Sequence, residues 1–116
     1  MIKVSVLLKR KPGMSVEEFH HYWKDVHGPL LLSVPELMRY IRRYVQCHAI
    51  AETFAGTPGA ASEYDGIAEM WGDSLDDVRR ALAEPRYMEV IRPDEEKFLD
   101  LANCVFIVTE EVPLKG

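Results

Sequence analysis

Apolar and polar residues alternate along four segments of the chain, as they do in β-strands that bury one face. The first segment spans residues 2–10, and the next three span residues 40–51, 64–71 and 103–112. The apolar side of the first segment consists of Ile2, Val4, Val6 and Leu8. The last segment is apolar on both of its faces.

Helical spacing lies between these strands. Ser15 and Glu18 form a capping box, which predicts a helix from about Val16 to His27. Gly28-Pro29 should end or kink that helix, because the residue before a proline avoids helical geometry. A short second helical piece is expected directly after it.

A further helix begins at Ser74, which caps it together with Asp77, and shorter helical turns follow Pro85. The resulting order, β-α-β-β-α-β in one domain of residues 1–116, predicts an α+β, ferredoxin-like fold. In that fold, helices cover one face of a four-stranded antiparallel sheet. Its outer strands would hold Cys47 and Cys104 too far apart for a disulfide.

The second face of such a sheet needs cover as well. Val105 and Ile107 on the last strand and Leu7 on the first would lie there. We therefore expect a homodimer formed sheet to sheet, a dimeric α/β barrel, with a partly exposed apolar face as the alternative.

The composition excludes several classes of protein. A net charge of −5, from 14 basic and 19 acidic residues with no long basic block, argues against nucleic acid or an anionic membrane as partner. The sequence shows no signal peptide and no apolar run of membrane-spanning length, so a cytoplasmic location is expected. The two cysteines form no CxxC motif, which excludes a zinc ribbon or a thioredoxin-type site.

Three of the four histidines lie in the stretch FHHYWKDVHGPLLLS. Helical spacing places His20, Trp23, Val26, His27 and Leu30 on the core face and His21 outward. Neighbouring histidines point about 100° apart, and His20 and His27 are two turns apart, so we predict no metal site here. His27 is the candidate acid/base residue, with the capping of helix carbonyls as the alternative, and His20 is expected to be structural.

The second strand places Tyr44, Gln46 and His48 on one face, which suits the wall of a pocket, although an exposed polar edge would show the same pattern. On the third strand, Asp65, Glu69 and Trp71 share a face. A carboxylate beside tryptophan in an apolar setting has a raised pKa and can exchange protons, the alternative being a solvated or ion-paired carboxylate. The loop 51–63 is a candidate lid.

Motifs for nucleotides, flavins, serine hydrolases and zinc peptidases are all absent from the sequence. We therefore expect acid/base chemistry without an organic cofactor, and no bound metal.

Four elements of the chain make it similar to the EthD-like family of dimeric α/β barrels: F-x-x-Y-W…HGP, R-Y-V-Q-x-H, D-G-x-x-E-x-W and D-x-x-x-F-x-D. They fall on Phe19, Tyr22, Trp23, His27, Gly28 and Pro29, on Arg43, Tyr44, Val45, Gln46 and His48, on Asp65, Gly66, Glu69 and Trp71, and on Asp94, Phe98 and Asp100. Cys47 stands where many relatives carry Asn, and Gly72 where an aromatic residue often follows the Trp. The resemblance implies a dimer with a pocket between helices and sheet in each protomer.

Residues and resemblance together favour a cofactor-independent isomerase, decarboxylase or dehydratase acting on a small hydrophobic oxygenated ring, such as a lactone, phenol or polyketide-like compound. His27 and His48 would be the acid/base pair. The substrate would contact Trp23, Tyr44, Asp65, Glu69 and Trp71. The alternatives are a non-catalytic binding protein that serves a partner oxygenase, and a cofactor-free oxygenase.

Overall fold

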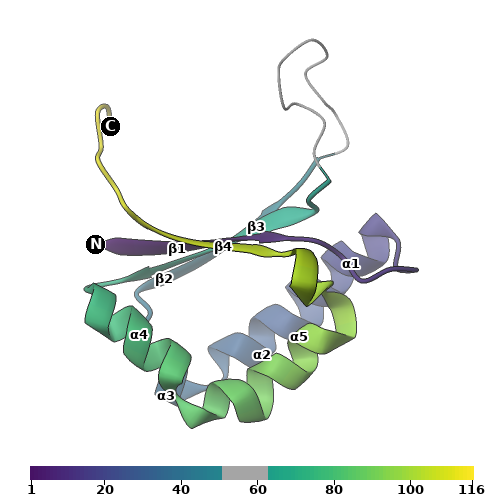
Figure 1. Ribbon diagram of the computed structural model, residues 1–116, viewed down its shortest axis with the longest axis horizontal. Coiled ribbons are helices and arrows are strands. Elements are labelled where there is room, and N and C mark those ends of the chain that lie inside the picture. Colours follow the sequence, from purple (N-terminus) through teal and green to yellow (C-terminus); the bar gives the residue numbers. More distant parts are fainter. Residues whose placement is uncertain (51–62) are drawn as a thin grey trace.

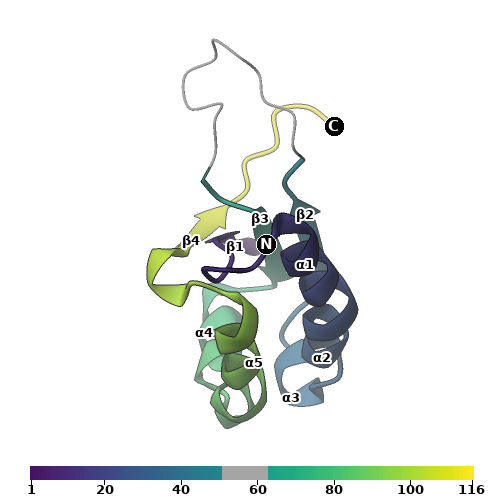
Figure 2. The same ribbon diagram turned by 90° about the vertical axis from the view of Figure 1, so that its right-hand side faces the viewer.

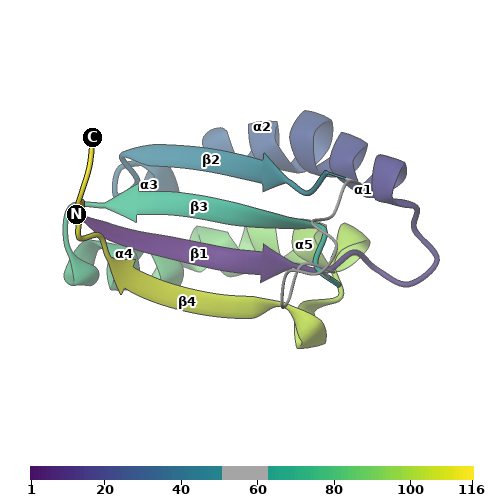
Figure 3. The ribbon, with the colours of Figure 1, turned by 90° about the horizontal axis from the view of Figure 1, so that it is seen from above.

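The computed structural model describes residues 1–50 and 63–116. Residues 51–62, and with them nearly all of the predicted lid loop, lie outside the described residues. Four strands form one antiparallel sheet in the order β2-β3-β1-β4, which confirms the ferredoxin-like prediction (Figure 3). The strands are β1 (Ile2–Leu8), β2 (Arg43–His48), β3 (Gly66–Gly72) and β4 (Val105–Glu110).

All helices of residues 1–50 and 63–116 lie on one face of this sheet (Figure 1). They form two neighbouring rows beneath it (Figure 2). The first row contains α1 (Val16–Tyr22), η1 (Trp23–His27), α2 (Gly28–Leu32) and α3 (Pro35–Met38). The second contains α4 (Leu75–Ala83), η2 (Tyr87–Ile91) and α5 (Arg92–Phe98), and η3 (Leu101–Asn103) leads into β4. The expected capping groups at Ser15 and Ser74 are both present.

Of the two outcomes predicted for Gly28-Pro29, an end of the first helix or a kink in it, the end does not occur. The segment η1 is a π-helical turn in which the Gly28 N–H donates to the Trp23 carbonyl, and helical geometry continues through α2. A proline inside a helix lacks one N–H and its ring clashes with the carbonyl four residues earlier, and the wider π turn relieves both problems. The second row repeats this arrangement, with η2 directly before Arg92-Pro93.

The π turn also changes which side chains reach the core. Its extra residue shifts the helical phase, so Val26, predicted on the core face, is 42% exposed. Leu31 is buried, whereas Leu30, the predicted core residue, is half-buried. His27 lies within a continuous helix rather than at its end, so it does not cap terminal carbonyls.

The two faces of the sheet differ in cover. The inner face, which includes Val4 and Ala68, packs against the helices. On the outer face, Val105, Ile107 and Ile67 are 43%, 49% and 38% exposed. The C-terminal segment leaves β4 on this outer side (Figure 1).

Candidate functional site

A cavity of about 240 Å³ lies between the inner face of the sheet and the helices. Aliphatic and aromatic side chains make up most of its wall, including Val6, Leu31 and Phe98. A small apolar space with few polar groups is the usual form of a site for a small organic ligand. Its polar lining residues are His27, Tyr44, Tyr87, Arg92 and Glu95.

His27 is oriented by a buried carboxylate. Its Nδ1 lies 2.8 Å from Oδ2 of Asp94, and both side chains are only 7% exposed. The Tyr22 hydroxyl donates to the other oxygen of Asp94. Burial first, and then the hydrogen bond and charge of Asp94, raise the pKa of Tyr22 to about 12, so Tyr22 stays protonated and donates. Asp94 therefore accepts two hydrogen bonds from the same helix row.

This arrangement determines which nitrogen of His27 is reactive. With the Nδ1 proton donated to Asp94, the neutral ring carries its lone pair on Nε2. Nε2 makes no hydrogen bond to any described residue. Because the ring lines the cavity, Nε2 can accept or return a proton there, and Asp94 stabilises the imidazolium.

Trp23 forms the wall of the cavity next to β2 and β3. Its indole lies against Gly66, where a Cβ would come within 2.6 Å of the ring carbon Cζ3. A side chain at position 66 would thus displace the wall. The indole also stacks on His48, with ring centroids 4.5 Å apart and planes 17° apart.

His48 does not line the cavity. Its Nε2 lies 2.9 Å from Oε1 of Gln46, and its ring centroid is 4.6 Å from that of His20. Burial first, then the charges of His20 and Lys24, lower the pKa of His48. The structure therefore does not bring His27 and His48 together on one cavity, as the acid/base pair predicted from the sequence requires.

The other two helix histidines lie as predicted. His20 is half-buried, with Nε2 2.9 Å from the Asp65 carbonyl oxygen. His21 points outward and pairs with Asp25. Neither of them lines the cavity.

Tyr44 does line the cavity, as expected for a substrate contact. Its hydroxyl oxygen accepts from Gln46 Nε2 at 2.9 Å. Burial raises the pKa of Tyr44, so the phenol keeps its proton and can donate it to a ligand oxygen. Trp23 and Tyr44 are thus the two predicted substrate contacts that the structure places at the cavity.

The three substrate contacts predicted on the third strand do not line the cavity; they are Asp65, Glu69 and Trp71. Asp65 is buried and accepts from the Arg10 guanidinium at 2.6 Å and from the Arg10 backbone N–H at 2.9 Å. It therefore holds the chain between β1 and α1, as an ion-paired carboxylate.

Glu69 and Trp71 share a face, as predicted, but it is the outer face of the sheet. The hydrogen bond from Lys3 is the largest of the effects that lower the pKa of Glu69, so of the two alternatives given for this carboxylate the ion pair is the one found, and the raised pKa is not. Lys3 and Arg43 lie over the Trp71 ring, at 5.1 and 4.7 Å from its centroid. Strand alternation predicted that these side chains group together but not which face of the sheet the helices cover.

The sequence assigned no individual role to several residues of the candidate site. Asp94 and Tyr22 were recognised only as parts of motifs, since nothing in the sequence indicates that they meet at His27. Arg92, Glu95 and Tyr87 lie around the second π turn and look in sequence like an exposed charged helix. The sequence does contain a signal for the two π turns, because Pro29 and Pro93 each lie two residues after the end of one of them.

Among residues 1–50 and 63–116, no group of three or more His, Cys, Asp or Glu side chains is placed to hold a metal ion. Cys47 and Cys104 are both unpaired. Within the same residues, no helix has the length and apolar character needed to cross a membrane.

The chain is similar in sequence to proteins named as a dehydratase and a decarboxylase. The chain is 24% identical over 115 residues to the conidial pigment biosynthesis dehydratase EthD of Metarhizium robertsii, covering 93% of this chain and 80% of the relative. It is 27% identical over 105 residues to the decarboxylase claH of Passalora fulva, covering 84% and 67%.

Solved structures share the fold. An EthD-like protein of Ralstonia eutropha superposes with a TM-score of 0.71 at 23% identity, covering 98% of this chain and 94% of the other. A dimeric protein of unknown function with a ferredoxin-like fold from Bacteroides fragilis gives a TM-score of 0.65 at 17% identity, with 95% of each chain covered. Residues 11–102 match the EthD domain, and the chain belongs to this family.

Proposed function

We propose that this protein is a lyase of the dehydratase or decarboxylase type that acts without a cofactor on a small hydrophobic oxygenated ring compound. The observation that carries the proposal is His27, whose Nδ1 lies 2.8 Å from Asp94 and whose side chain lines an apolar cavity. The curated relatives named dehydratase and decarboxylase support this reaction class.

For dehydration, His27 Nε2 accepts a proton from the carbon next to a carbonyl. The imidazolium then returns that proton to the departing hydroxyl, so that water leaves and a double bond forms. For decarboxylation, Nε2 accepts the proton of the carboxyl group, and the imidazolium delivers it to the ring carbon as the bond from that carbon to the carboxyl breaks and carbon dioxide leaves. In both reactions the Asp94 carboxylate stabilises the transient charge on His27. The apolar walls, including Trp23, hold the ring and limit access of water.

The experiment compares two histidines. Wild type, His27→Gln and His48→Gln are incubated with a panel of hydroxylated bicyclic ketones and aromatic β-keto acids, and loss of water or carbon dioxide is followed by mass spectrometry. General acid/base catalysis contributes about 10²–10⁴-fold, so His27→Gln should lose at least about 10²-fold in turnover while His48→Gln stays within about threefold.

Full turnover by folded His27→Gln protein contradicts the proposal. Binding of panel compounds by wild type and by His27→Gln, with no turnover by either, would instead favour the binding-protein alternative.

We further propose that two chains pair through the outer faces of their sheets. The exposed apolar side chains Val105, Ile107 and Ile67 support this pairing. The dimeric description of the Bacteroides fragilis relative supports it too. Light scattering after size exclusion should give the mass of two chains for wild type and of one chain for Ile107→Glu. Leu32→Glu, on the exposed side of α2, serves as a control that should stay dimeric. A wild-type monomer at micromolar concentration would contradict the pairing.

A further inference from the structure

Two charged side chains, Arg92 and Glu95, line the otherwise apolar cavity, and no other Lys, Arg, Asp or Glu of the described residues does so. Burying charge in an apolar wall is costly unless the charge is paired or serves a ligand. The cluster consists of a cation and an anion one helical turn apart on α5. The proposed reaction step at His27 uses neither of them.

Contacts on one side hold the guanidinium of Arg92 in place. Its Nε donates to Oε1 of Glu95 at 3.0 Å. The Tyr87 hydroxyl lies 2.7 and 2.9 Å from the two oxygens of the same carboxylate. The guanidinium carbon lies 5.4 Å from the Tyr87 ring centroid. Burial is the main cause that raises the pKa of Tyr87 to about 12, so this hydroxyl stays a donor to Glu95.

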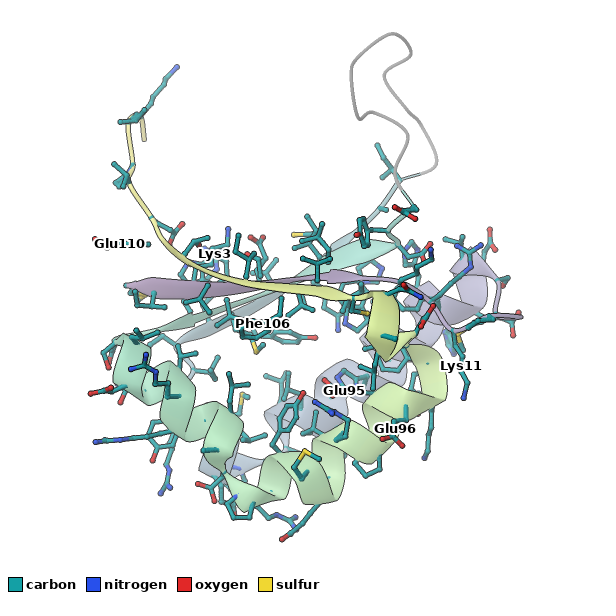
Figure 4. All side chains as sticks on the ribbon, viewed as in Figure 1. Lys3, Lys11, Glu95, Glu96, Phe106 and Glu110 are labelled. Carbon is teal, nitrogen blue, oxygen red and sulfur yellow. The ribbon has the colours of Figure 1, made fainter. Side chains whose placement is uncertain are left out.

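Some N–H groups of the Arg92 guanidinium have no acceptor on Glu95 or Tyr87, and the cluster lies at the open side of the cavity. A guanidinium has five N–H groups, more than Glu95 and Tyr87 accept in this arrangement. The Arg92 side chain is 37% exposed. Phe106 and Leu82, which line the same cavity, are 50% and 42% exposed, so the cavity opens between β4 and the second helix row. Figure 4 shows Glu95 on α5 and Phe106 on β4 on the two sides of this opening.

We propose that Arg92 is a positioning residue that binds a carboxylate on the ring compound, which makes the substrate class cyclic carboxylic acids. The proposal rests on the proposed function for what happens at His27. The planar guanidinium matches the two oxygens of a carboxylate, and the apolar wall accepts the ring. Arg92 and His27 come from different helix rows and line the same cavity.

The test measures binding rather than turnover, so it does not depend on the reaction. The affinities of 2-naphthoate and its neutral counterpart 2-naphthamide are compared by calorimetry for wild type, Arg92→Gln and Arg86→Gln. Arg86 makes the same i,i+3 pair with a glutamate, at 3.1 Å, but does not line the cavity. Wild type and Arg86→Gln should prefer the naphthoate by about tenfold or more, and Arg92→Gln should lose that preference.

Wild type that binds both probes equally, or neither, overturns the proposal, as does a preference that persists in Arg92→Gln. If Arg92→Gln does not fold, Arg92→Lys replaces it, and its preference should be weaker than that of wild type because the fork geometry is lost. His27→Gln should retain the preference. If His27 proves irrelevant to turnover, the naphthoate preference still decides the role of Arg92.

Discussion

Two histidine environments of this molecule differ in chemistry. His27 is buried, lines the cavity and is held by an acidic partner, Asp94. His48 does not line the cavity, stacks on the Trp23 indole and lies beside a second histidine and a neutral amide. The two imidazoles thus differ in what they can do. The partner of a histidine, rather than its presence near a pocket, decides whether it can serve as a base.

Removing the Trp23 ring, which lines the cavity and stacks on His48, should have the largest effect. Trp23 is 1% exposed, so Trp23→Ala should lower the free energy of unfolding by about 3–5 kcal/mol, because it leaves a large hole beside Gly66. Urea denaturation measures this loss. Leu32→Ala, at a position 59% exposed, should change stability by less than about 0.5 kcal/mol. Equal free energies of unfolding for the two variants would contradict the role of Trp23 as a tightly packed wall of the cavity.

Neutralising Asp94, the acidic partner of His27, should have the second-largest effect. Asp94→Asn keeps the shape of the side chain but no longer stabilises the imidazolium, and its amide can impose the wrong tautomer on His27. We expect kcat/KM to fall by about 10²-fold or more on any substrate the panel yields. Asp100→Asn, which changes a carboxylate bonded to Asn103 outside the cavity, is the matched control. Unchanged kcat/KM for folded Asp94→Asn would remove the distinction between the two histidines.

The hydroxyl that supports Asp94 should contribute less. Tyr22→Phe removes one charge-assisted hydrogen bond and should cost about 1–3 kcal/mol of stability, with a smaller loss of turnover than Asp94→Asn. Because the pKa of Tyr22 is raised to about 12, the hydroxyl is a donor throughout neutral pH. The stability difference should therefore be the same at pH 6 and pH 9. Denaturation curves at both values check this, and a difference that vanishes at pH 9 would mean that Tyr22 ionises.

The smallest expected effect concerns His48. Its pKa lies below the ordinary value of 6.5, so between these two values the unfolded chain binds more protons than the folded one. The contribution of His48 to stability is thus fully present above pH 6.5 and is lost as pH falls toward its lowered pKa. His48→Gln should flatten the dependence of the urea midpoint on pH between 7.5 and 5. Identical slopes for wild type and variant would place His48 in an unperturbed environment.

Strand alternation and capping residues were enough to predict the sheet, its antiparallel order and the side of the first helix that carries Trp23. At Gly28-Pro29 they left open whether the helix ends or kinks, because local rules treat a proline as a break in the helix and do not anticipate a π turn. The same omission misplaced Val26 and assigned His27 to a helix end.

The candidate site was harder to predict, because its key contact joins residues 67 positions apart in the chain. Periodicity assigns a residue to a face, and neither Asp94 nor Arg92 shows on its own that it faces His27 or a cavity. Glu69 and Trp71 illustrate the complementary error. Their shared face was predicted correctly, but the choice between inner and outer face depends on how the helices pack over the sheet.

Each π turn contains one residue more than a regular helix of the same length, and this has a consequence for how the chain can be redesigned. In a regular helix, losing one residue rotates every later residue by about 100° relative to those before it. The π turn accommodates one extra residue within a single turn, so deleting Lys24 and returning to regular winding would leave His27 near the side of the helix that it occupies now. The π turn is therefore a place where the chain can change in length by one residue while the reactive group stays beside Asp94.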